Sequence, residues 1–161
     1  MIAQVDVQIA CDNEGLPESD EIESWVRHAI SAAAYDVTCE VEVSVRIVDS
    51  EEIQALNREF RQQDKPTNVL SFPAGAIEGL PADVPKALGD IVICAQVVSD
   101  EATEQGKASG AHWAHMVVHG TLHLLGFDHA DENEAIEMEG HESRILTTLG
   151  IADPYGESRE T

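Results

Sequence analysis

The chain is organised around one stretch, His119-Gly120-Thr121-Leu122-His123-Leu124-Leu125-Gly126-Phe127-Asp128-His129. His119 and His123 are four residues apart, so on a helix they lie about 40° apart around the axis and about 6 Å along it. Two imidazoles at this spacing can bind one metal ion. On a continuous helix His129 would lie roughly 9 Å further along, too far to reach the same ion. The helix must therefore end between them, and Gly126 can adopt the left-handed conformation of a helix terminus.

Three histidines with an open fourth position are typical of catalytic zinc, whereas structural zinc sites are usually closed by four protein ligands. Five of the seven histidines fall within residues 112–129, and three of those five have ligand spacing around a glycine. We therefore predict one zinc ion per chain, bound by His119, His123 and His129. His112 and His115 precede the motif and are interpreted as structural or supporting groups.

The same spacing matches the His-x-x-x-His-x-x-Gly-x-x-His pattern of the metzincin proteases, with Met138 as a candidate packing methionine. Those enzymes need a glutamate directly after the first histidine as the general base. Gly120 occupies that position here. A metzincin-like metalloprotease is therefore kept as an alternative, and metal chemistry of another kind is favoured.

Length and composition favour a single domain, residues 1–161, with a polar tail at about 151–161. Apolar residues make up 43% of the chain, which excludes wholesale disorder. No apolar run approaches the roughly 18–20 residues of a membrane span, and the first residues lack the basic start of a signal peptide. A cytoplasmic location without a membrane partner is expected.

The charge distribution limits how an anionic substrate could bind. Nine Lys and Arg against thirty-one Asp and Glu give a net charge of −22, a field that repels nucleic acid at low salt. Arg58, Arg61 and Lys65 nevertheless place a third of the basic residues within eight positions. A phosphate substrate would have to be bound at this cluster and at the metal, while the acidic excess is interpreted as a solvated surface.

The hydrophobic pattern predicts an α+β fold with a small mixed four-stranded sheet, about five helices, and the metal site on a central helix. Strands are expected at residues 2–9, 38–48, 67–72 and 89–94, and the first two are expected to pair. Helices are expected at residues 19–34, 50–60, 96–105, 109–125 and 132–149. Ser50 and Ser109 are well placed as N-caps. Residues 73–88 contain three prolines and two glycines, and they predict a loop of the length that is often functional.

Motifs spread over nearly the whole chain carry a family resemblance: Leu56-Asn57 followed by Arg61, Asp64-Lys65-Pro66-Thr67-Asn68-Val69-Leu70-Ser71-Phe72-Pro73, Leu88-Gly89-Asp90-Ile91, the stretch from His119 to His129, Met138-Glu139, Ile145-Leu146, Leu149-Gly150 and Pro154-Tyr155. Together they resemble the YbeY-type endoribonucleases, metal-dependent bacterial enzymes of ribosomal RNA maturation. The family often has tyrosine where Phe127 stands here, a departure that leaves the predicted ligands intact.

The resemblance implies zinc on His119, His123 and His129, and a functional arginine at Arg61. It also implies cleavage of single-stranded RNA, processing of the 3′ end of small-subunit ribosomal RNA, and a part in ribosome quality control. Ribosomes or ribosomal proteins are expected partners, because the acidic surface favours only weak binding to isolated RNA. The non-catalytic alternative is a zinc-stapled, ribosome-associated binding module.

The proposed metal-assisted hydrolysis suggests roles for several polar residues, of which the resemblance itself implies only that of Arg61. Arg61 is expected to donate paired hydrogen bonds to phosphate oxygens as charge builds on them. Asp128 is a candidate for orienting a ligand imidazole, with a helix-end or turn role as the alternative. The candidates for substrate binding are Arg58, Lys65, Thr67, Asn68 and Ser71. The last three could equally hold the Arg61 loop against the metal helix. The nucleophile is left open between a metal-activated water and the RNA's own 2′-hydroxyl.

Overall fold

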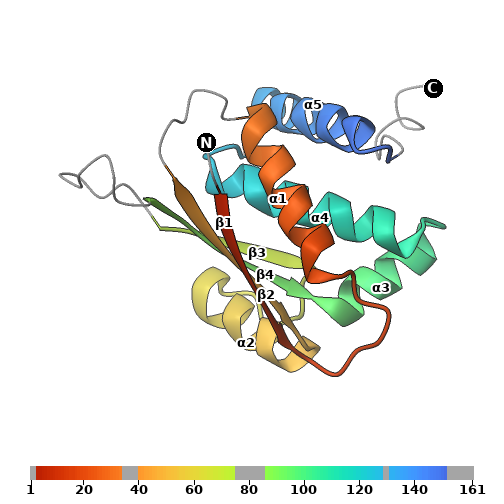
Figure 1. The fold of residues 1–161 in the computed structure, drawn as a ribbon. Coiled ribbons are helices and arrows are strands. Elements are labelled where there is room, and N and C mark those ends of the chain that lie inside the picture. Colours follow the sequence, from red (N-terminus) through yellow and green to blue (C-terminus); the bar gives the residue numbers. More distant parts are fainter. Residues whose placement is uncertain (1–2, 34–39, 75–85, 129–130, 152–161) are drawn as a thin grey trace.

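A four-stranded mixed sheet positions the histidine helix and the loops around it (Figure 1). The computed structural model describes residues 3–33, 40–74, 86–128 and 131–151. In the strand order β1-β2-β4-β3, β1 (Ala3–Ala10), β2 (Val41–Val48) and β4 (Lys86–Cys94) run parallel. The edge strand β3 (Val69–Pro73) is antiparallel to β4. The predicted mixed sheet and the predicted pairing of the first two strands are confirmed.

Helices lie on both faces of this sheet (Figure 1). α1 (Ser19–Ala33) and α4 (Ser109–Leu124) cover one face, and α5 (Glu132–Thr148) packs on these two helices from outside. α2 (Ser50–Arg61) covers the other face, and α3 (Ala95–Glu104) follows β4 directly and packs against α4. The described residues thus form an α+β domain with five helices, as predicted. None of these helices is long and apolar enough to cross a membrane.

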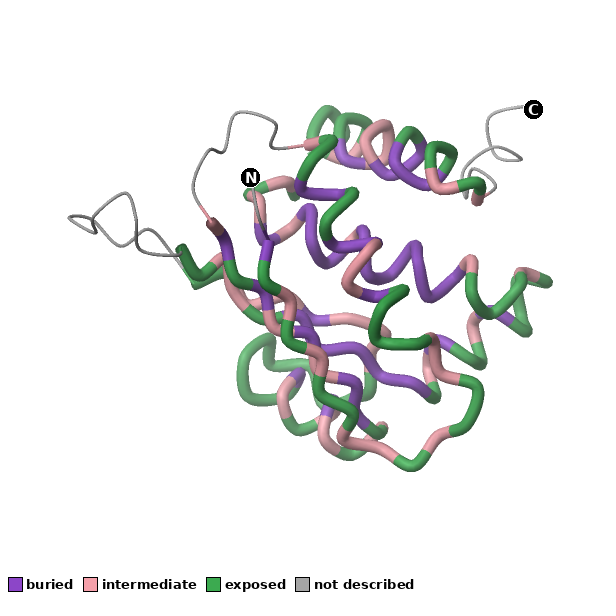
Figure 2. The backbone as a smooth tube through the Cα atoms, viewed as in Figure 1, coloured by how far each residue is buried: buried purple, intermediate pink, exposed green. Residues whose placement is uncertain are grey.

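α4 is the central helix of the domain. It contacts α1, α3, α5, β3 and β4, and its buried side chains include Trp113, Val117 and Leu122. Figure 2 shows this burial running along most of the helix and through the middle of the sheet. The sequence of α4 is apolar on most sides because neighbouring elements enclose it. The histidines therefore sit on the most firmly held helix of the fold.

β4 begins earlier than the sequence pattern predicts, at Lys86 rather than Gly89. Gly89 has a φ of 139°, and a Cβ atom there would collide with the carbonyl oxygen of Phe72. A glycine inside a strand marks a bulge or a close backbone approach, and the register with β2 shifts at this level. The prediction treated this glycine as the start of the strand. Residues 75–85 of the predicted loop lie outside the described residues, as does the tail beyond Ile151.

The two predicted N-caps are wrong by one residue. Asp49 has an extended backbone and caps α2, because its side chain accepts a 2.9 Å hydrogen bond from the backbone N–H of Glu52. Ser50 is the first residue of that helix. Ser109 is likewise the first residue of α4, and Ala108 stands at the cap position without a side-chain hydrogen bond. An aspartate carboxylate one position earlier satisfies the free N–H group that the serine was expected to bind.

Candidate active site

His119 and His123 lie one turn apart on α4 and turn their rings toward each other. Their Nε2 atoms are 3.1 Å apart and their ring centroids 4.7 Å. Zinc–nitrogen bonds of about 2.0–2.1 Å at a tetrahedral angle would place two ligand nitrogens about 3.3 Å apart. The separation of the two nitrogens therefore fits a shared tetrahedral ion.

The helix ends where the sequence predicts. Gly126 has a φ of 103°, and its backbone N–H donates a 3.1 Å hydrogen bond to the carbonyl oxygen of His123. The N–H of Phe127 donates to the carbonyl oxygen of Leu122, also at 3.1 Å. This pair of bonds is a Schellman motif, which closes a helix at a left-handed glycine and reverses the chain. The chain is thereby turned back immediately before His129.

His129 lies outside the described residues. Among the residues that the structure describes, no three His, Cys, Asp or Glu side chains form a group that could hold a metal ion. The described part of the site consists of two imidazoles in ligand geometry. The third ligand and the identity of the ion stay predictions.

A carboxylate on α5 contacts the first of these histidines. Oε1 of Glu142 lies 2.5 Å from Nδ1 of His119, and its Oε2 lies 3.3 Å from Nε2 of His115. Burial would raise the pKa of this carboxyl, but the hydrogen bonds from His115 and His119 outweigh burial and lower the pKa to about 2. Glu142 is therefore an ionised acceptor for both rings.

Sequence reasoning missed Glu142, although a signal was present. Met138, Glu142 and Leu146 recur every four residues on α5 and are all buried. A single acidic residue in an otherwise apolar stripe needs a partner on the neighbouring element, because burying an unpaired charge is costly. The histidine-rich helix was the available source of such a partner.

A pocket of about 500 Å³ opens beside the two histidines. The described residues on its wall are Arg61, Thr67, Asn68, Val69, Leu70, Ser71, Pro73, His119, His123, Gly126, Phe127 and Asp128. Segments from α2, from β3 and from the end of α4 thus meet around one cavity. Arg61, Thr67, Asn68, Ser71 and Asp128 were all candidates from the sequence, and the structure brings them together with His119 and His123.

Two basic candidates do not line this pocket. Arg58 lies one turn before Arg61 on α2, where its side chain is exposed and 3.5 Å from the carboxylate of Asp64. Lys65 follows in the loop and is also exposed. Of the three basic residues in this cluster, Arg61 lines the pocket, and Arg58 and Lys65 are exposed side chains outside its lining.

The loop after Arg61 is held by a buried side chain. Asn57 is 1% exposed and donates a 2.9 Å hydrogen bond from its side chain to the carbonyl oxygen of Lys65. Its own backbone oxygen accepts a hydrogen bond from Gln63, and Gln62 ends α2 in the left-handed conformation with a φ of 57°. These contacts fold the chain back at the end of α2. They fix the position from which Arg61 reaches the pocket.

Two further pocket residues also hold elements together. Ser71 donates a 3.1 Å hydrogen bond to the carbonyl oxygen of Gly120, which ties β3 to the turn of α4 between the histidines. Asn68 donates to the carboxylate of Glu101 at 3.1 Å and accepts from the backbone N–H of Val69 at 2.7 Å. These contacts support the interpretation that Ser71 and Asn68 hold the loop and strand against α4 and α3. Both residues also line the pocket, so a role in substrate binding stays a prediction.

Gly120 faces the sheet. A Cβ atom there would lie 2.8 Å from Cγ2 of Ile91 and 3.3 Å from the hydroxyl of Ser71. A side chain as large as glutamate at this position would collide with Ile91, which is fully buried. The packing of α4 thus disfavours the general base of a metzincin-like protease.

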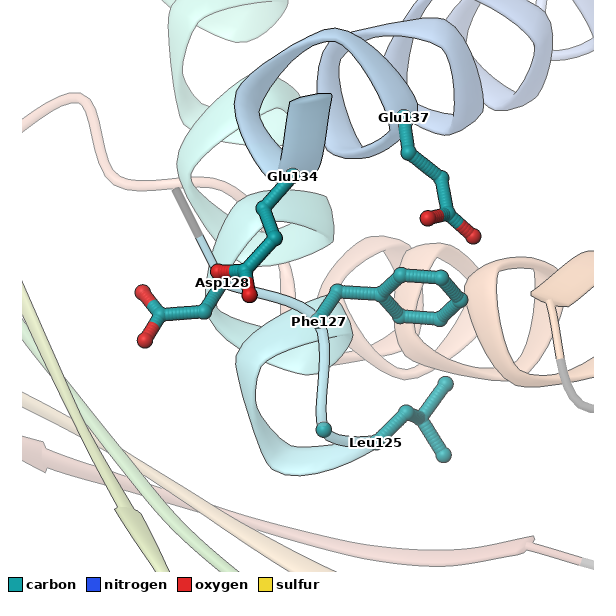
Figure 3. A pocket seen from close by; sticks show the side chains of 6 residues that line it. Leu125, Phe127, Asp128, Glu134 and Glu137 are labelled. Carbon is teal, nitrogen blue, oxygen red and sulfur yellow. The ribbon is translucent and has the colours of Figure 1, made fainter. Parts of the chain in front are cut away.

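A second cavity lies on the other side of the turn that follows α4. Its described lining includes Asp128 from the turn and Glu134 and Glu137 from the start of α5. Figure 3 shows the two glutamates extending from α5 toward the turn that carries Leu125 and Phe127. Asp128 lines both cavities. Glu134 and Glu137 line this cavity and not the pocket that holds Arg61, and their carboxylates repel a phosphate, so an anionic substrate is favoured in the pocket that holds Arg61.

Comparisons with known proteins identify the family of the chain. Residues 8–150 match the family model described as endoribonuclease YbeY. The chain is 52% identical to the endoribonuclease YbeY of Halorhodospira halophila over 141 aligned residues. The aligned region covers 88% of this chain and 89% of that protein. The solution structure of the Thermotoga maritima protein TM1509 is similar with a TM-score of 0.54 at 25% sequence identity, over 92% of this chain and 97% of that one. The chain belongs to the endoribonuclease YbeY family.

Proposed function

We propose that this protein is a zinc-dependent endoribonuclease that cleaves single-stranded RNA, acting in the cytoplasm on the 3′ end of small-subunit ribosomal RNA and in ribosome quality control. The family supports the reaction class. The observation that carries the proposal is the pocket whose wall joins two imidazoles in metal-ligand geometry to one arginine. Metal and guanidinium together are suited to a phosphodiester, which is negatively charged and gains charge as it reacts.

The residues that would hold the ion are His119, His123 and the predicted third ligand His129. When bound, zinc supplies Lewis-acid polarisation of a phosphate oxygen and lowers the pKa of a water molecule toward about 7. The donor set of imidazole nitrogens suits this ion. The 3.1 Å separation of the two Nε2 atoms is the geometric support for it.

Arg61, which lines the same pocket as the two histidines, would act on the phosphate. Its guanidinium can donate two parallel hydrogen bonds to the phosphate oxygens, which binds the substrate and stabilises the additional charge of the transition state. Thr67, Asn68 and Ser71 line this pocket as well. In this proposal their polar groups would contact the sugar and phosphate groups next to the scissile bond.

The acidic surface explains why a partner is expected. A chain with a net charge of −22 repels isolated RNA. Contacts with ribosomal proteins would supply the binding free energy that the surface charge removes. Targeting would then come from the ribosome, and Arg61 with the metal would act only on RNA that reaches the pocket.

The test is cleavage of a ribosomal RNA 3′ precursor, with ribosomes present and absent, by the zinc-loaded protein and by the protein treated with a chelator. We expect cleavage that the chelator abolishes and zinc restores. His123→Ala should lose it, whereas His28→Ala, which changes an exposed histidine on α1, should retain it. Zinc bound without cleavage would favour the binding module, and zinc-dependent cleavage of casein would favour the protease.

A further inference from the structure

Glu142 is not part of the ligand motif, although it contacts a histidine of that motif. It belongs to α5, lies 23 positions beyond His119, and is 0% exposed. In the part of the chain that the structure describes, it is the one buried Asp or Glu. Its two oxygens are divided between two rings of α4, Oε1 with His119 and Oε2 with His115.

The contact with His119 is made through Nδ1, the nitrogen that does not face His123. A carboxylate accepts hydrogen bonds and donates none when ionised, so the proton of a neutral His119 ring lies on Nδ1. Nε2 of His119 is then the unprotonated nitrogen through which the ring can bind a metal, and it lies 3.1 Å from Nε2 of His123. The hydrogen bond thus selects the tautomer that a metal ligand needs.

The second oxygen of Glu142 explains how the carboxylate keeps its orientation. His115 lies one turn before His119 on the same face of α4, and its Nε2 is 3.3 Å from Oε2. One oxygen on each ring fixes the plane of the carboxylate between two turns of one helix. The packing of α5 on α4 then sets the direction of the His119 ring.

We propose that Glu142 is a positioning residue of the metal site, which holds the His119 ring with Nε2 directed toward the ion while His115 holds the other carboxylate oxygen. The inference rests on the proposed zinc-dependent function and adds to it a residue outside the ligand motif. In metal sites, a carboxylate behind a ligand histidine typically changes metal affinity about 10- to 100-fold. A residue that only joined α5 to α4 would change the stability of the fold and leave the zinc affinity of the folded protein unchanged.

The experiment measures the dissociation constant of Zn²⁺ by competition with a chelator for the parent chain, Glu142→Gln and Glu101→Gln. Glutamine keeps the shape of the side chain and removes its charge. Glu101 provides the matched control, because it pairs with His112 on α4 at 2.9 Å, away from the two ligand nitrogens. Circular dichroism and thermal unfolding establish in parallel that each variant is folded.

We expect the zinc dissociation constant to rise about 10- to 100-fold in Glu142→Gln and to stay within about twofold of the parent value in Glu101→Gln. A folded Glu142→Gln variant that binds zinc as tightly as the parent overturns this inference alone. A parent chain that binds no zinc overturns the proposed metal-dependent function together with it.

A second measurement covers the case in which Glu142→Gln does not fold. Long-range proton–nitrogen NMR spectra of the zinc-free parent chain report the tautomer of each histidine ring. We expect His119 to carry its proton on Nδ1. A neutral His119 ring protonated on Nε2 overturns the inference without any variant.

Discussion

The hydroxyl of Ser71 donates a 3.1 Å hydrogen bond to the carbonyl oxygen of Gly120. This contact joins the edge strand β3 to α4 at the turn that separates the two histidines. Ser71→Ala removes it, and a lost hydrogen bond of this kind costs about 0.5–1.5 kcal/mol of stability. Chemical denaturation of the parent and the variant measures the difference. An unchanged free energy of unfolding together with weaker RNA cleavage would assign Ser71 to substrate binding rather than to holding the elements together.

Gly120→Ala tests how closely α4 lies on the sheet. The added Cβ would be 2.8 Å from Cγ2 of Ile91, which is fully buried. Overpacking a core costs about 1–3 kcal/mol, against a gain of about 1 kcal/mol in helix propensity. The net result expected is a loss of up to about 2 kcal/mol in the free energy of unfolding.

Gly140→Ala is the matched control for that substitution. Gly140 lies inside α5, and a Cβ atom there would meet nothing within 4 Å. The same change should therefore stabilise the protein by about 0.5–1 kcal/mol. Opposite signs for the two variants in urea unfolding are the expected outcome. Equal signs would mean that α4 can shift away from Ile91 at little cost.

Arg61→Ala tests which of the basic residues acts on the substrate. Arg61 lines the pocket with His119 and His123, and removing one donor to a developing negative charge costs about 100- to 1,000-fold in rate. Arg58 is exposed and paired with Asp64, so Arg58→Ala should lower the rate only a few-fold through long-range attraction. Steady-state cleavage of a single-stranded RNA gives both values. Arg144→Ala, an exposed change on α5, is the control for loss of positive charge.

Whether a feature of this site could be predicted depends on how far apart along the sequence its residues lie. The turn of helix between His119 and His123 and its termination at Gly126 are local, so their spacing and residue types predict them. The apolar composition of α4 on most of its sides is also a local feature. These features were expected and are confirmed.

Contacts between elements were not available from local patterns. The pairing of Glu142 with His119 depends on how α5 packs against α4, and Gly89 is required by the approach of β3. The charge pattern predicts that a phosphate binds at the basic cluster and at the metal, but only the family resemblance singles out Arg61 within that cluster. Nothing in the spacing of 58 residues between Arg61 and His119 indicates that one pocket joins them, since the pocket is formed where the end of α2, β3 and the end of α4 meet.

The lowered pKa of buried His112 should make the stability of the protein depend on pH. Its side chain is buried and lies 2.9 Å from Glu101. Burial lowers the pKa of His112, Glu101 opposes that change, and the charges of His115 and Lys107 add to it. The unfolded chain therefore binds a proton on this residue at a higher pH than the folded chain does. The resulting stability is fully present above about pH 6.5, the unfolded pKa, and is lost as the pH falls through the lower folded value.

The measurement for His112 compares two pH series. Free energies of unfolding between pH 7.5 and pH 5 are determined for the parent chain and for His112→Gln, in the absence of metal. The parent should lose more stability on acidification than the variant, because the variant lacks this titrating group. Histidines that do not interact with His112 contribute equally to both series and cancel in the difference. Parallel series would mean that His112 is equally basic in the folded and unfolded chains.

Zinc should stabilise the folded chain through the two imidazoles of α4. An ion that binds only the folded state at a concentration 100 times its dissociation constant adds about 2.7 kcal/mol. For a domain of this size each kcal/mol raises the melting temperature by about 2–4 °C, so a rise of about 5–10 °C is expected. His28→Ala, on the exposed side of α1, should show the same rise, and His123→Ala should show little of it. A chelator should reverse the effect in the parent and in His28→Ala. An equal rise in all three proteins would place the stabilising zinc somewhere other than between His119 and His123.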